Sequence, residues 1–222
     1  MRISWECKLP RAVSKGAVTF DLETVKVARA GGPWVWPDGS KNARRWVPFV
    51  CGVGSLTSDR CEVEVWNSFN EREMIDAIEE SLPIFAMNTG GRITYRSRNK
   101  FDEMVLKGRF VHARHALAAG PGDWPHWEED ECDLKFVPIG DRPATKFLRP
   151  ASDQFDWPRL IRADWAGSNI QLSPALEERL PEVLQHCARD VLENLEVDCA
   201  ELELSALPAL RRFYAAPPVT GG

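Results

Sequence analysis

The sequence contains no long hydrophobic segment, and this absence limits where the protein can work. A transmembrane helix needs about 18 or more consecutive apolar residues, and no such run occurs in the 222 residues. The first residues, Met1 to Cys7, also lack the apolar core of a secretory signal peptide. We therefore expect a cytoplasmic protein with no membrane partner.

The cysteines lack the spacing of a zinc site or of a disulfide framework. None of the six forms a Cys-x-x-Cys pair. They are Cys7, Cys51, Cys61, Cys132, Cys187 and Cys199. This scattered pattern is typical of reduced, mostly buried thiols in a cytosolic protein.

An excess of positive charge is also missing. The chain has 28 Lys and Arg residues against 33 Asp and Glu residues, which gives a net charge of −5. Proteins that coat nucleic acid non-specifically depend on a basic surface, so the net charge argues against this class. A nuclease is not excluded, because the carboxylates of a metal site contribute negative charge and local Arg and Lys residues can still hold a phosphate backbone.

The composition that remains is ordinary for a globular protein. Hydrophobic residues make up 44 % and charged residues 27 % of the chain, which is long enough for one sizeable core. We predict a single domain over residues 1–222, with a core over about residues 17–200. An irregular insertion rich in Pro, Trp and Asp is expected over about residues 120–165, and the tail from Pro217 is expected to be frayed.

Apolar, alternating and β-branched segments predict a sheet. The predicted strands are residues 17–24, 46–56, 61–66, one of 84–87 and 92–95, and 134–139. The first three follow one another closely, so we expect antiparallel pairing among them. The fourth is expected to return beside the first.

Three segments have helical spacing of their apolar residues. They are residues 71–82, residues 101–117, and a long segment from Ser173 to about Leu204. Pro83 is expected to end the first helix. Ser173 as N-cap and Pro174 as the first helical residue begin the third, which is expected to break at Pro181 and resume at Glu182.

Two carboxylates lie at the end of the first predicted strand. Asp21 and Glu23 are spaced i, i+2, which points both side chains to one face of a strand. Such a pair at the end of a buried strand is costly, because repulsion and desolvation add together. A divalent cation compensates this cost, and oxygen ligands favour Mg²⁺ or Mn²⁺ over zinc. The alternative is an edge strand whose acids face water.

Three short motifs, in chain order, resemble those of the DEDD-type 3′-5′ exonucleases of the ribonuclease-H-like superfamily. They are Phe20-Asp21-Leu22-Glu23-Thr24, Asn99-Lys100-Phe101-Asp102 and His186-Cys187-Ala188-Arg189-Asp190-Val191. The resemblance spans about residues 17–197 and implies a mixed five-stranded sheet flanked by helices. It also implies two Mg²⁺ (or Mn²⁺) ions: Asp21 bridges both, Glu23 binds one of them, Asp190 completes the first site, and Asp102 holds the second ion, often through water.

The third motif departs from the family pattern at the position of the base. The family has a His five residues before the Asp, or a Tyr four residues before it; here these positions are Gln185 and His186. An i, i+4 pair lies on one side of a helix, so His186 occupies the position of the Tyr. The resemblance then implies that His186 acts as base or orients water. A structural His186, or a third motif at His126-Trp127-Glu128-Glu129-Asp130, is the alternative.

The resemblance implies hydrolysis at the 3′ end of single-stranded or frayed DNA or RNA. Thr24, Arg98 and Lys100 are the candidate contacts to the nucleic acid. A polymerase or repair partner stays open. One alternative is a catalytically degenerate homologue that binds nucleic acid or a protein partner. Another is an unrelated α/β protein, in which Asp102 is merely an acid at a helix N-terminus and Asp190 a solvated residue.

Overall fold

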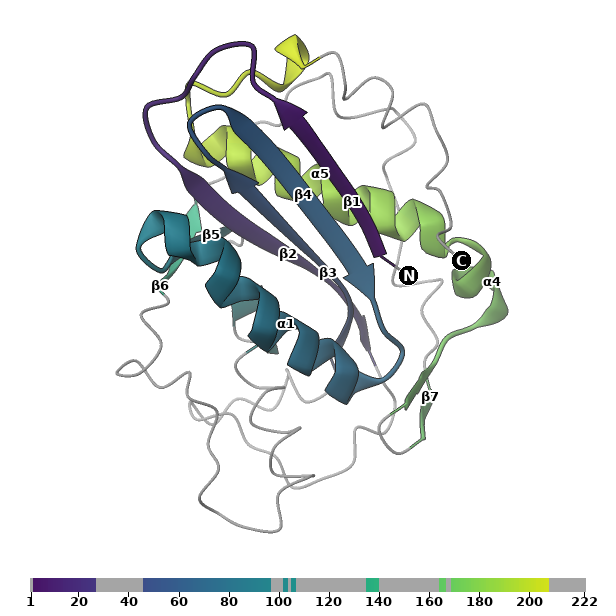
Figure 1. The fold of residues 1–222 in the computed structure, drawn as a ribbon. Helices are drawn as coiled ribbons and strands as arrows, with labels where there is room; N and C mark the ends of the chain where they lie inside the picture. Colours follow the sequence, from purple (N-terminus) through teal and green to yellow (C-terminus); the bar gives the residue numbers. More distant parts are fainter. Residues whose placement is uncertain are drawn as a thin grey trace, which may run out of the picture.

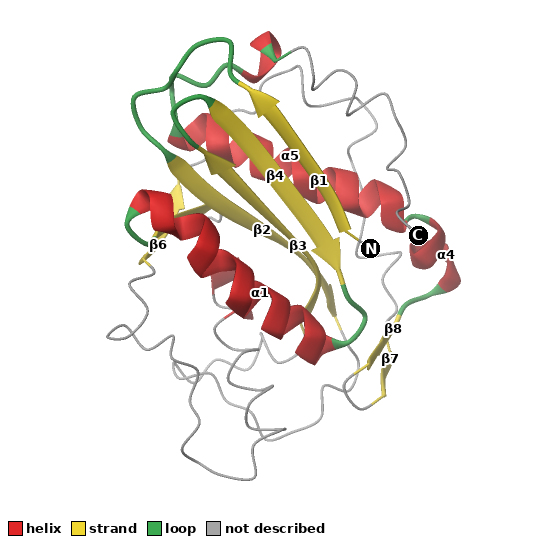
Figure 2. Cartoon of the chain, viewed as in Figure 1, coloured by secondary structure: helices red, strands yellow, loops and turns green. Residues whose placement is uncertain are grey.

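The structure of the chain is a computed structural model. It describes residues 2–26, 46–96, 102–103, 105–106, 135–139, 164–166 and 169–207. This part of the chain forms a mixed α/β fold, as predicted, in which two long helices lie on opposite faces of a six-stranded sheet (Figures 1 and 2). No helix within these residues has the length and apolar character needed to cross a membrane.

The sheet combines antiparallel and parallel pairing. Its strands are β1 (Arg2–Lys8), β2 (Ala17–Lys26), β3 (Trp46–Leu56), β4 (Arg60–Asn67), β5 (Arg92–Arg96) and β6 (Lys135–Ile139), and their order is β1-β4-β3-β2-β5-β6. The four strands from β1 to β2 in this order pair antiparallel, whereas β5 is parallel to both β2 and β6. Strands β7 (Asp164–Ala166) and β8 (Asn169–Gln171) form a separate antiparallel pair.

All five predicted strands are present, and residues 92–95 prove to be the correct choice for the fourth. The predicted number of strands is nevertheless wrong, because β1 adds a sixth. This strand pairs with β4 and packs Ile3, Trp5 and Cys7 against the core, while the intervening side chains are exposed. A short, half-exposed edge strand gives a weaker apolar signal than a central one, which explains the omission.

Helix α1 (Glu71–Ala86) begins at the predicted residue but ends later than predicted. The Asn70 side chain caps its start by accepting a hydrogen bond from the Glu73 N–H at 3.2 Å. Pro83 does not end the helix, which continues for one more turn. Leu82 and Ala86, four residues apart, are both buried against the sheet, so packing holds this turn in place.

The C-terminal helical segment breaks close to the predicted position. Helix α4 (Pro174–Glu178) is followed by Arg179 and then by α5 (Leu180–Asp198), with Pro181 in the first turn, where a missing N–H costs nothing. The expected end near Leu204 is wrong. The backbone at Cys199 is extended, with φ −119° and ψ 98°, and the chain returns Leu204 to the core in a short 3₁₀ turn, η3 (Leu204–Ala206).

Several expectations lie outside the described residues. The predicted helix over 101–117 is described only at residues 102–103 and 105–106, which are helical. Most of the insertion over 120–165, the tail, and the residues Arg98, Lys100, His126 and Cys132 are not described. The other five cysteines are free thiols, as expected, and four of them are buried.

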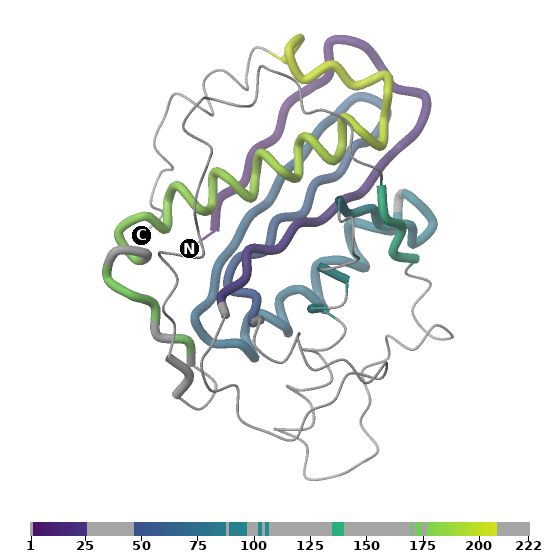
Figure 3. Tube along the Cα trace, turned by 180° about the vertical axis from the view of Figure 1, so that it is seen from behind, coloured from purple at the N-terminus to yellow at the C-terminus, as the bar shows by residue number. Residues whose placement is uncertain are grey.

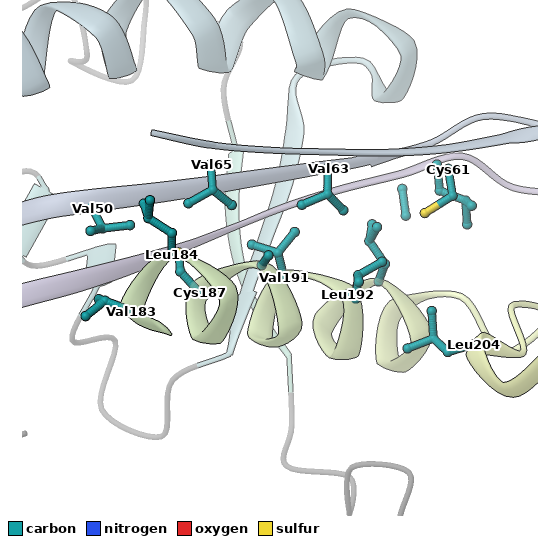
Figure 4. Close-up of a cluster of buried hydrophobic side chains, with 14 of the residues drawn as sticks. Val50, Cys61, Val63, Val65, Val183, Leu184, Cys187, Val191, Leu192 and Leu204 are labelled. Atoms are coloured by element: carbon teal, nitrogen blue, oxygen red, sulfur yellow. The ribbon is translucent and has the colours of Figure 1, made fainter. Parts of the chain in front are cut away.

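The core consists of two apolar layers, one on each face of the sheet. Alternation along β2 places Val18 and Phe20 in the layer under α1 and places Val25 in the layer under α5. Figure 4 shows part of the second layer, where β4 side chains such as Val63 face Val191 of α5. From behind, α5 runs along this face of the sheet (Figure 3). The same alternation directs Asp21 and Glu23 toward α5.

Candidate metal centre

Carboxylates from three separate segments meet beside the middle of β2, which continues past Asp21 and Glu23 to Lys26 and does not end at them as expected. Asp21 and Glu23 lie on β2, Asp102 lies in the helical residues after β5, and Asp190 lies on α5. The charge of Asp190 raises the pKa of each of the other three. Since Coulomb repulsion weakens with distance, these shifts indicate one cluster, which we call the carboxylate cluster.

Histidine and cysteine side chains complete the cluster. His186 Nε2 lies 3.4 Å from Asp190 Oδ2 and 3.8 Å from Glu23 Oε1. The ligand atoms of Glu23, His186 and Asp190 lie within 4.8 Å of one another, and the same holds for Asp21, Glu23 and Cys187. Glu23 belongs to both groups, so the two groups are contiguous.

Burial and mutual repulsion make ionisation of these acids costly. Burial, followed by the charge of Asp190, raises the pKa of Asp102 to about 7. Burial is also the main cause that raises the pKa values of Asp21 and Glu23 well above their ordinary range, followed by Asp190 and then Asp102. A hydrogen bond from Cys187 lowers the pKa of Asp21 without outweighing these causes. A bound cation removes such repulsion, so the cluster suits a divalent metal ion.

A glycine in β3 allows α5 to lie close to the sheet. Gly52 pairs with Asp21 across the β2–β3 ladder. A Cβ atom on Gly52 would lie 2.8 Å from both Cys187 Sγ and Val191 Cγ2, closer than real Cβ atoms approach their neighbours. The absence of this Cβ atom therefore sets the distance between the sheet and the turn of α5 that carries Asp190.

We expect Gly52→Ala to lower the free energy of unfolding by about 1–3 kcal/mol, the usual cost of overpacking a core. It should also weaken Mn²⁺ binding, because α5 must move outward and take Asp190 away from Asp21. Urea denaturation and Mn²⁺ titration measure the two effects. A second substitution, Val191→Ala, should restore part of the lost stability and part of the lost Mn²⁺ affinity.

Gly54→Ala is the matched control for this prediction. A Cβ atom there would lie 2.5 Å from Val191 Cγ1 and 2.9 Å from Leu195 Cδ1, so it strains the same helix further from the carboxylates. We expect a similar loss of stability with a smaller loss of Mn²⁺ affinity. If Gly52→Ala changes neither quantity, the close contact does not position the cluster.

The comparisons with known proteins add no assignment. No protein-family model, no curated protein and no solved structure matches this chain. The chemistry of the carboxylate cluster must therefore be argued from its own geometry.

The structure brings together five of the eight residues that the sequence singles out. They are Asp21, Glu23, Asp102, His186 and Asp190. Thr24 follows Glu23 on β2, and strand alternation places it on the opposite face. Arg98 and Lys100 lie outside the described residues.

Sequence reasoning missed Cys187 as a member of the cluster. Its thiol is buried and donates to the backbone carbonyl of Asp21 at 3.7 Å. The available signal was its spacing from Val191 and Leu195, which marks the side of α5 that faces the sheet. A sulfur and an imidazole nitrogen thus lie among the possible ligand atoms, beside the carboxylate oxygens that the sequence predicts.

Proposed function

We propose that the protein is a two-metal-ion 3′-5′ exonuclease that hydrolyses phosphodiester bonds at the 3′ end of single-stranded or frayed DNA or RNA. The observation that carries the proposal is the meeting of Asp21, Glu23, Asp102 and Asp190 from three segments, in the chain order of the DEDD motifs. A ribonuclease-H-like fold is part of the proposal. A central β2 with an antiparallel neighbour on one side and a parallel neighbour on the other supports it.

The four carboxylates are proposed to hold two Mg²⁺ or Mn²⁺ ions. Carboxylate oxygens are the ligands that these ions prefer, and four negative charges match two divalent cations. Bound divalent ions supply a site of this kind with an activated water and with stabilisation of the leaving oxygen. Asp21, whose pKa is raised by all three of the other acids, would contribute to holding both ions.

His186 is proposed as the base or as the group that orients the attacking water. Its Nε2 atom lies 3.8 Å from a carboxylate oxygen of Glu23 and 3.4 Å from one of Asp190. The side chain is 22 % exposed, so it can reach water at the edge of the cluster. An imidazole can accept a proton near neutral pH, and the two carboxylates favour an orientation in which Nε2 faces the cluster.

The proposal is tested with 5′-labelled single-stranded DNA and RNA incubated with Mg²⁺, Mn²⁺ or EDTA. We expect a ladder of products shortened from the 3′ end in the presence of either metal and no ladder with EDTA. Asp190→Asn serves as the inactive control. Mn²⁺ binding without any cleavage indicates a catalytically degenerate binding protein. Absence of both Mn²⁺ binding and cleavage contradicts the proposed function.

A further inference from the structure

The carboxyl end of β5 lies beside the carboxylate cluster. Strands β2 and β5 are parallel, and Thr19 lies opposite Thr94. Two residues further along each strand, Asp21 and Arg96 are therefore level with each other. Tyr95 and Arg96 are the last two residues of β5, and alternation directs them to opposite faces of the sheet.

On one face, Arg96 holds the turn of α5 that carries Asp190. Arg96 Nη1 lies 3.0 Å from Glu193 Oε2, and the two side chains are only 19 % and 5 % exposed. Glu193 follows Asp190 by three residues, about one helical turn. Removing one partner of a buried ion pair is strongly destabilising, so this contact holds α5 to β5 one turn after Asp190.

On the other face, Tyr95 holds the segment that carries Asp102. Tyr95 is fully buried, and its ring centroid lies 5.6 Å from that of Phe20. Its hydroxyl donates a hydrogen bond to Glu103 Oε2. Glu103 directly follows Asp102, so a rigid aromatic side chain in the core anchors the backbone at Asp102.

We propose that Tyr95 and Arg96 are separate positioning residues for the two ends of the carboxylate cluster. Tyr95 acts through Glu103 on Asp102, and Arg96 acts through Glu193 on Asp190. This assignment rests on the proposed two-metal function, because each positioning residue then acts on a ligand of a different metal ion. The tip of β5 thereby fixes the segments that carry Asp102 and Asp190, which would hold the ions, although neither Tyr95 nor Arg96 is itself a ligand.

The test measures Mn²⁺ binding to the full chain by electron paramagnetic resonance of the free ion. We expect Tyr95→Phe and Arg96→Gln each to lower the affinity for one of the two bound ions by about 10- to 100-fold. This is the range for residues that orient metal ligands. In an Asp102→Asn background, Tyr95→Phe should have no further effect, whereas Arg96→Gln should still weaken binding. In an Asp190→Asn background, Arg96→Gln should have no further effect, whereas Tyr95→Phe should still weaken binding.

Two variants on the same strand separate positioning from general stability. Thr94→Val removes a hydroxyl that bonds the Val18 carbonyl at 3.0 Å. Arg92→Gln breaks an ion pair with Asp198, whose two contacts are both 2.7 Å, at the far end of β5. Both should lower the free energy of unfolding while leaving Mn²⁺ affinity unchanged. Arg96→Lys, which keeps the charge and the fold, should retain more affinity than Arg96→Gln.

The outcomes distinguish this inference from the proposed function. If the wild-type protein binds two Mn²⁺ ions and the Tyr95 and Arg96 variants bind them equally well, the positioning role is wrong and the exonuclease proposal is unaffected. An equal loss of affinity in all four variants also contradicts it, because that loss follows stability alone. A wild-type chain that binds no Mn²⁺ overturns both.

Discussion

Replacing Asp21 with asparagine is expected to lower the rate of metal-dependent cleavage by roughly 10³-fold or more. Metal ions stabilise the transition state of such a reaction by several kcal/mol, and this stabilisation would be lost. Asparagine keeps the shape of the side chain but removes the charge that interacts with all three other acids of the carboxylate cluster. Steady-state rates on a 5′-labelled single strand and Mn²⁺ titration measure the loss. Asp76→Asn, on the exposed face of α1, is the matched control and should leave both quantities unchanged.

The same substitution should stabilise the metal-free protein. Acids whose pKa is raised in the folded state bind protons more tightly there, so the stability they contribute is present at low pH and is lost as pH rises through the folded pKa. For Asp102 this window extends from its ordinary value of 3.8 to about 7. With EDTA, Asp21→Asn should therefore unfold at a higher temperature than the wild type, and the gap should widen toward pH 7. Equal melting temperatures at every pH would contradict the repulsion within the cluster.

The second large effect is expected for His186. His186→Ala should lower turnover by roughly 10²-fold or more, the range for loss of a general base, while Mn²⁺ affinity stays nearly intact. His186→Tyr should retain more activity than His186→Ala, because a phenol four residues before Asp190 can still orient water. Asp190→Ala, in contrast, should weaken metal binding as well. Single-turnover rates at saturating Mn²⁺ separate a loss of turnover from a loss of metal binding.

Wild-type activity in His186→Ala would show that this side chain is structural. The contacts of Nε2 with Glu23 and Asp190 would then serve only to hold α5 against β2. In that case His126, in the insertion, becomes the next candidate for the base.

The parts of the site that follow from local geometry were predictable. Asp21 and Glu23 share a face because they are two residues apart on a strand, and His186 and Asp190 share a side because they are four apart on a helix. Each of these two rules requires only that the segment be known as a strand or as a helix. The strand signal over residues 17–24 and the helical spacing after Ser173 supplied that type, and both elements are present.

The parts that depend on packing between distant elements were not predictable. In the sequence Gly52 does not differ from any other glycine in a strand. Its close approach to Cys187 exists only when α5 lies across β3. The Arg96–Glu193 pair likewise joins residues far apart in the chain, and Arg96 in the sequence is one cation among several. Pro83 was misjudged for a related reason, because the sheet buries the turn that follows it.

The distant origins of the carboxylates also affect the rate at which the protein unfolds. Their repulsion arises only when β2, the segment around Asp102 and α5 have packed together, so ions that need all of these groups bind the native state alone. Interactions that form late in folding change the unfolding rate more than the folding rate. Divalent ions are therefore expected to slow unfolding without accelerating folding. In a cell the lifetime of the native chain would then depend on the concentration of free divalent ions as well as on its apolar core.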